Sequence, residues 1–135
     1  MAGSTRAVGI LCVCAIALCT GCRHNDLIPI SGDVTYDQRP VVKGTIMFQP
    51  VDGQGPTAAA VIKDGKYAAN VATGKKQVQI EGFNVLGQRH YVPNDPSSPM
   101  VDIQEQYLPE RYNAASRLTR EITRDVDTYD FALEK

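Results

Sequence analysis

The residues with the most distinctive chemistry are the cysteines, and all four lie within the first 22 positions of a 135-residue chain. Closely spaced thiols can pair as disulfides, ligate a metal or be modified. Residues 7–21 (AVGILCVCAIALCTG), however, are almost wholly apolar and uncharged, and they follow Arg6. A charged start, an apolar run of this length and small residues at its end are typical of a secretory signal peptide. We therefore interpret residues 1–21 as a segment that is removed, in which cysteines serve only as apolar positions.

The last cysteine, Cys22, has a different context. The stretch from Leu18 to Cys22 (LCTGC) resembles the bacterial lipoprotein signal, in which small residues precede a cysteine that receives a diacylglycerol. The resemblance implies cleavage after Gly21 and lipidation of Cys22, with acyl chains such as palmitate holding the protein on a bilayer. Plain secretion and an uncleaved anchor are the alternatives, although the apolar run is shorter than the roughly 20 residues of a spanning helix.

Removal of residues 1–21 leaves Cys22 as the one cysteine of the chain, with its sulfur bonded to lipid. We therefore expect no disulfide, no cysteine-based metal site and no cofactor. Stability must then come from burial of a modest core. The net charge of −1 gives no basic field, so nucleic acid is not an expected partner.

His90 is the main candidate for catalytic chemistry in the rest of the chain. With Asp95 or Asp102 beside it, this histidine would be the general base of a small hydrolase. The favoured interpretation is a solvated loop histidine, so we expect no enzyme. Asp95, Asp102 and Glu105 follow no recognised Ca2+ loop spacing, and no metal site is predicted.

Alternation of apolar and polar residues predicts an all-β domain over residues 28–135, after a short tether at residues 22–27. Asp64-Gly65 lies between two strand-like runs and is a strong signal for a tight hairpin. Short strands separated by turns at short intervals are typical of a β-sandwich. Seven strands are expected, at residues 28–36, 42–49, 57–62, 66–71, 75–83, 118–124 and 129–133.

Regular alternation stops over residues 84–116, which contain four prolines. We expect a long loop there, and long loops in compact domains are often functional. Its tyrosines near residue 110 have two interpretations, as rings that stack on sugars or as rings that fix the loop to the domain. The candidate binding residues of this segment are Arg89, His90, Tyr91, Tyr107 and Tyr112.

Several short motifs occur in a fixed order along the predicted domain. They are ISGDV at 30–34, RPV at 39–41, Gly44, KDGKY at 63–67, GK at 74–75, LPxxYN with Ser116 and Leu118, and DFxL at 130–133. Together they resemble the carboxypeptidase regulatory-like, transthyretin-like β-sandwich family, and more narrowly its small bacterial lipoproteins. The resemblance covers about residues 28–134. It implies a seven-stranded, prealbumin-like (Ig-like) sandwich without a catalytic mechanism.

These observations predict a lipoprotein of the cell envelope with a non-catalytic binding or scaffolding domain. Arg23 follows the modified cysteine, and the resemblance to lipoproteins of Gram-negative bacteria then favours the periplasmic or outer-membrane side. The expected partners are the lipid bilayer, through acylated Cys22, and an envelope protein or polysaccharide. A carbohydrate-binding module, which needs exposed coplanar tyrosine rings, and the hydrolase built on His90 are the alternative functions.

Overall fold

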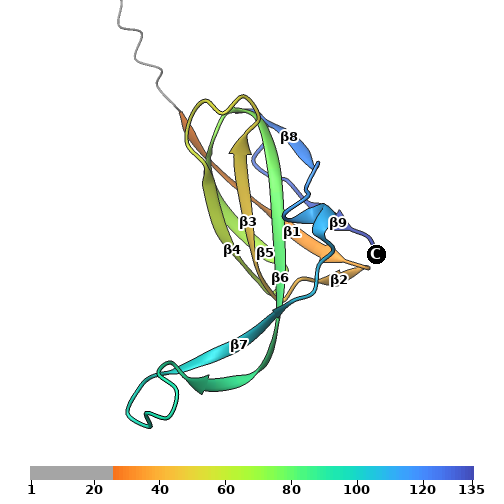
Figure 1. The fold of residues 1–135 in the computed structure, drawn as a ribbon. Helices are drawn as coiled ribbons and strands as arrows, with labels where there is room; N and C mark the ends of the chain where they lie inside the picture. Colours follow the sequence, from red (N-terminus) through yellow and green to blue (C-terminus); the bar gives the residue numbers. More distant parts are fainter. Residues whose placement is uncertain (1–25) are drawn as a thin grey trace, which may run out of the picture.

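The computed structural model describes residues 26–135, so Cys22 and the predicted signal segment lie outside the described part. The described chain is all-β, a curled and mainly antiparallel sheet with one 3-10 turn (Figure 1). Its elements are β1 (Leu27–Tyr36), β2 (Arg39–Pro40), β3 (Lys43–Pro50), β4 (Ala58–Lys63), β5 (Lys66–Ala72), β6 (Gly74–His90), β7 (Met100–Gln106), the 3-10 turn η1 (Glu110–Tyr112), β8 (Thr119–Ile122) and β9 (Phe131–Leu133).

The strands follow the order β2-β1-β5-β4-β3-β6-β7, while β8 pairs with β6 and β9 pairs in parallel with β1. The sheet curls between β4 and β5, which pair only at Lys63 and Lys66. Asp64 and Gly65 make the turn between them with φ angles of 52° and 77°. Positive φ at both central residues is what a tight type I′ turn requires, and the predicted hairpin is confirmed.

The core lies between the two halves of the curled sheet. Alternate residues of each strand point inward, so that Phe48 of β3, Tyr67 of β5 and Phe131 of β9 form one aromatic cluster with ring centroids 5.9–6.3 Å apart. The Tyr67 hydroxyl donates a 2.7 Å hydrogen bond to the Tyr129 carbonyl, and burial raises the pKa of Tyr67. The predicted core positions Phe48, Tyr67, Tyr129 and Phe131 are confirmed as buried.

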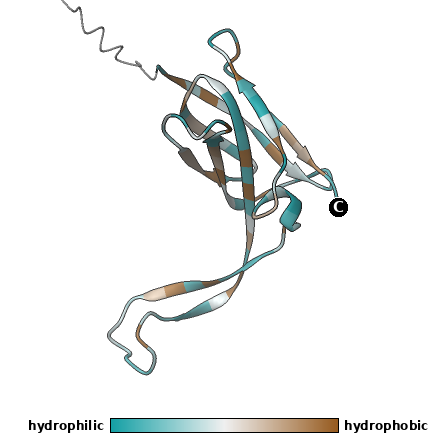
Figure 2. Ribbon diagram, turned by 45° about the horizontal axis from the view of Figure 1, so that its top comes forward, coloured by the Kyte–Doolittle hydropathy of each residue, from teal (hydrophilic) through white to brown (hydrophobic). Residues whose placement is uncertain are grey.

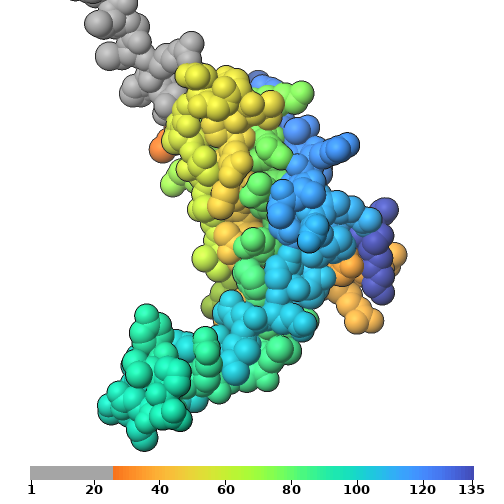
Figure 3. Space-filling view, in the orientation of Figure 1, coloured from red at the N-terminus to blue at the C-terminus, as the bar shows by residue number. Residues whose placement is uncertain are grey.

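The predicted long loop over residues 84–116 is wrong at residues 84–90 and 100–106, which are strands. Strand β6 continues to His90 and pairs with β7, so residues 83–106 form a hairpin, called here the arm. The arm projects from the rest of the described chain, called here the body (Figures 1 and 3). Because neither face of the arm is buried against the body, its strands carry no regular apolar alternation, and sequence periodicity did not reveal them.

Nine strands are present in the described residues where seven were expected. The seven expected strands correspond to β1, β3, β4, β5, β6, β8 and β9. The additional strands are β7, in the arm, and the two-residue β2, which pairs with the end of β1 inside the predicted turn. After the arm the chain returns to the body, where Leu108 is buried and the Ser116 hydroxyl donates to the Val78 carbonyl.

Gly32 provides a test of how tightly the body is closed. A Cβ atom at this position would lie 2.0 Å from the Tyr129 carbonyl oxygen, whereas one at Gly87 in the arm would meet nothing within 4 Å. We expect Gly32→Ala to lower the free energy of unfolding by about 2 kcal/mol, because the backbone of the facing segment must move. The matched variant Gly87→Ala changes stability little. Urea denaturation of both variants measures the difference, and equal stabilities would contradict the close approach.

Candidate binding surface

The arm is held at its base by the same strand that crosses the body. Gly82 of β6 pairs with Gly44 of β3, and its carbonyl also accepts a 3.0 Å hydrogen bond from the Tyr107 amide. From Phe83 onward β6 pairs with β7. The register shifts between Val85 and Gly87, which is a β-bulge that increases local twist. The bulge therefore lies where the arm changes direction relative to the body.

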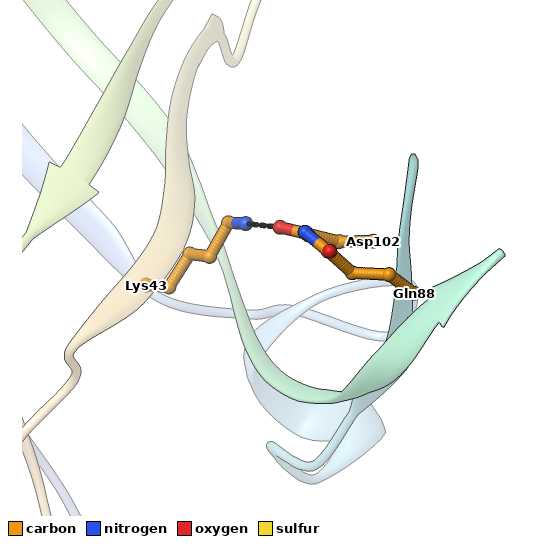
Figure 4. A network of polar contacts seen from close by, with 3 residues as sticks. All are labelled: Lys43, Gln88 and Asp102. Atoms are coloured by element: carbon orange, nitrogen blue, oxygen red, sulfur yellow. Dashed lines mark hydrogen bonds and ion pairs between the residues drawn. The ribbon is translucent and has the colours of Figure 1, made fainter. Parts of the chain in front are cut away.

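A polar contact fixes one face of the arm toward the body. Lys43 Nζ of β3 lies 2.8 Å from Asp102 Oδ2 of β7, and Gln88 Nε2 donates to Asp102 Oδ1 at 3.0 Å (Figure 4). The hydrogen bond from Lys43, then that from Gln88, lowers the pKa of Asp102 below its usual value. The pair is partly exposed, with 42% and 30% of the two side chains accessible, and contributes little stability. Its main effect is on orientation.

The tip of the arm, residues 91–99, is organised by its own hydrogen bonds. Asp95 Oδ1 accepts from the amide and the hydroxyl of Ser97 at 2.9 and 2.6 Å, which lowers the pKa of Asp95. Ser98 Oγ accepts from the Val92 amide at 3.1 Å. A loop fixed in this way loses less conformational freedom when it binds a partner.

Three of the predicted binding residues lie together at the outer end of the arm. Arg89 is exposed, His90 is half-buried with Nδ1 3.0 Å from the Ser98 carbonyl, and Tyr91 is 70% exposed. Tyr107 and Tyr112 lie elsewhere, against the body. The structure therefore divides the predicted surface into an arm group and a body group.

The two body tyrosines are engaged in packing. Tyr107 lies 6.0 Å from the Tyr36 ring at an interplanar angle of 56°, and burial raises the pKa of Tyr107. The Tyr112 hydroxyl accepts a hydrogen bond from the Glu134 amide at 2.9 Å. These contacts match the interpretation that the rings fix the segment to the domain. They do not give the exposed coplanar platform that a carbohydrate-binding module requires.

The groups considered for hydrolysis are bonded to other partners. Asp102 contacts Lys43 and Gln88, Asp95 contacts Ser97, and the His90 ring contacts a backbone carbonyl. No hydrogen bond between His90 and either carboxylate is present among the described residues. The described residues also contain no group of three His, Cys, Asp or Glu side chains arranged to hold a metal.

Sequence reasoning missed the exposed apolar side chains of the arm. Val85, Leu86, Met100 and Ile103 are 49%, 64%, 50% and 40% exposed, and hydrophobic residues occur along the arm in Figure 2. The available signal was the apolar content of Met100-Val101 and Ile103 within a segment otherwise rich in polar residues. Read as a loop, that segment gave no reason to assign these side chains to a surface.

A depression lies at the base of the arm, with a volume of about 320 Å3. Tyr36 and Tyr107 form one part of its wall, and Lys135 and Asp37, paired at 3.0 Å, contribute to its lining. Its lining is mixed in polarity and belongs to both body and arm. This position makes it part of the junction rather than of the tip surface.

Comparisons with protein families, curated proteins and solved structures find no significant match for the chain. The resemblance to transthyretin-like lipoproteins thus stays a prediction from the motifs quoted above. Among the described residues no helix has the length and hydropathy to cross a membrane. The class that the described structure itself defines is an all-β protein with a projecting hairpin.

Substitution of Lys43 tests the contact between arm and body. We expect Lys43→Met to raise the pKa of Asp102 toward its usual value, because the largest cause of the lowered pKa is removed. In the unchanged protein the folded-state pKa lies below the unfolded one. The contact is therefore complete above the unfolded pKa and is lost as pH falls through the folded one. A pH titration followed by carbon-13 NMR of the Asp102 carboxyl measures its pKa in the variant and in the unchanged protein. Lys63→Met, on the neighbouring strand, serves as the control, and an equal change there would refute the assignment.

Proposed function

We propose that the protein is a lipid-anchored scaffold of the cell envelope that presents the arm to a partner at a distance from the membrane. The observation that carries this proposal is where β1 begins and where β6 ends. The start of β1 lies close in sequence to Cys22, and the end of β6 lies in the arm. Cys22 precedes the first described residue, Asp26, by only four positions. Leu27 begins β1 at the end of the body where Ala72 pairs with it and where β6 starts at Gly74.

The direction of β6 places the arm away from that end. This strand has 17 residues and runs from Gly74 through the body to His90 in the arm (Figure 1). At about 3.3 Å per residue, its outer end lies roughly 55 Å from its start if the strand is fully extended. An anchor at Cys22 would thus hold one end of the body at the bilayer and leave the arm at the other end.

The finer fold proposal is a transthyretin-like sandwich for the body. Support comes from the seven strands at the predicted positions, which enclose one core between two halves of the curled sheet. The confirmed Asp64-Gly65 hairpin and the buried Phe131 of the DFxL motif agree with the quoted motifs. On this proposal β2 and β7 are additions to the sandwich.

The scaffold is proposed as non-catalytic, with an envelope protein or polysaccharide as partner. The support is the engagement of Asp95, Asp102 and His90 in contacts that build the arm. The accessible surface of the arm includes apolar side chains, Arg89 and polar residues of β7 such as Gln104 and Glu105, on a hairpin with a fixed tip. Rigid elements that present a variable segment are a common arrangement for recognition.

The anchor is tested by Cys22→Ser in the full chain. We expect the unchanged protein to fractionate with membranes, with an intact mass that lacks residues 1–21 and includes acyl groups on Cys22. The serine variant lacks the sulfur that accepts lipid, so it loses the acyl mass and the membrane association. Cys19→Ser, three residues earlier, is the matched control and retains both. A water-soluble native protein with residues 1–21 present would refute the proposal.

A further inference from the structure

The outer edge of β7 is unpaired in the described chain, because β7 contacts only β6 in the sheet order. Two hydrogen bonds show which backbone groups of β7 point toward β6, and the remaining groups point toward the free edge. The Tyr91 amide donates to the Pro99 carbonyl, and the Tyr107 amide donates to the Gly82 carbonyl. Odd-numbered residues from 99 to 107 therefore face β6. The amide and carbonyl groups of Met100, Asp102, Gln104 and Gln106 face outward.

This edge lacks several of the features that usually prevent strand pairing, although β7 carries the charges of Asp102 and Glu105. Exposed edge strands are commonly protected by lysine, proline or a covering segment. Strand β7 (MVDIQEQ) contains neither residue, and its Asp102 is bonded to Lys43 across one face. The arm is also a two-stranded ribbon, and such a ribbon is only marginally stable in water without further strands or packing. An added strand would complete it.

We propose that a second copy of this chain is that partner, through antiparallel pairing of the two β7 edges about Ile103. In this register Ile103 of each copy lies opposite its counterpart as a non-hydrogen-bonded pair, with close side chains. Asp102 lies opposite Gln104 of the second copy, and Met100 opposite Gln106. All of these flanking residues have outward-facing backbone groups, so the exchanged hydrogen bonds are complete. The product is a four-stranded ribbon made of two arms.

Charge complementarity selects this register. Arg89 pairs with Val101 inside one arm, and Val101 would lie opposite Glu105 of the second copy. Arg89 of one copy and Glu105 of the second copy then lie on the same face and in the same cross-strand row, with Val101 between them. The two-fold axis repeats this contact at the other end of the ribbon. The two Ile103 side chains form the centre of that face between these opposite charges.

Other symmetric registers are less favourable. A centre at Asp102 or at Glu105 would place two carboxylates directly opposite each other, which is destabilising. A centre at Gln104 would set Ile103 opposite a glutamate. A centre at Val101 would leave the last residues of β7 without counterparts in the other strand. Pairing about Ile103 is the arrangement that satisfies charge, burial and hydrogen bonding together.

The same geometry keeps both bodies on one side of the ribbon. Lys43 bonds to Asp102, so the body lies toward the face of the arm that carries Asp102 (Figure 4). A two-fold axis perpendicular to the ribbon preserves that face, and residues that lie opposite each other share it. The axis also reverses the long direction of the ribbon, so two copies in one bilayer are compatible with this dimer where each body turns out of the ribbon on that face. That compatibility alone rests on the proposed function, whereas the edge pairing does not.

The register is tested with Ile103→Cys in the full chain, oxidised in native membranes and digested with trypsin. The peptide from His90 to Arg111 contains no other cysteine, so its disulfide-linked dimer reports this contact alone. Opposed residues of a non-hydrogen-bonded pair lie within the Cα distance of a disulfide. We expect this linked peptide in high yield. Val101→Cys, on the same strand and face, places the two thiols about four residue spacings apart, roughly 13 Å, and remains unlinked.

Sedimentation equilibrium of the chain with Cys22→Ser measures the same dimer without an anchor, so failure of the lipidation proposal is distinguished from failure of this one. We expect Ile103→Lys to raise the dimer dissociation constant at least about tenfold, because two like charges would be opposed at the axis. Leu86→Lys, exposed on the arm but off the edge, leaves the constant unchanged. A monomer under both conditions, equal cross-linking at positions 101 and 103, or a monomer that pairs its β7 edge with a different peptide would each overturn the proposal.

Discussion

Strand β6 belongs to two different pairings, and this is the constraint on which the rest of the structure depends. Its first half, Gly74 to Gly82, lies between β3 and β8 and contributes Val78 and Ile80 to the core. Its second half pairs only with β7. Because the backbone is continuous, the packed half fixes the starting direction of the exposed half. The arm thus obtains its orientation from core burial, although the arm itself has little core.

The contact between Lys43 and Asp102 affects the bending of the arm, which the continuity of β6 does not fix. A bulge between Val85 and Gly87 twists the ribbon just beyond the body, and a two-stranded ribbon bends easily. An exposed ion pair adds little to global stability. Here it joins β7 to β3, which are not neighbours in the sheet, and it therefore restricts bending toward and away from one face. Because Asp102 pairs with Gln88, directly beyond the bulge, the ion pair attaches the arm to β3 at the point where the ribbon would bend.

The limits of sequence reasoning follow from the same division. Residues 77–81 (QVQIE) alternate because one face is buried, so the first half of β6 was predictable, as were the Asp64-Gly65 turn and the aromatic core around Phe131. The second half has water on both faces, and no periodicity marks it. Arg89, His90 and Tyr91 were identified as a candidate surface from their residue types. The free edge of β7 was not, because an edge is a property of strand order and not of any local pattern.

The body and the arm differ in what holds them together, and this difference bears on function. The body has an apolar core with Phe48, Ile80 and Phe131 almost fully buried, and the removal of a side chain there opens a cavity. The arm depends on exposed backbone hydrogen bonds, which open with low free energy. A partner that covers the β7 edge would stabilise the arm by mass action without any change in the body. On the proposed function, recognition and structural integrity belong to separate parts of one continuous strand, and the arm is the part whose order would increase most on association.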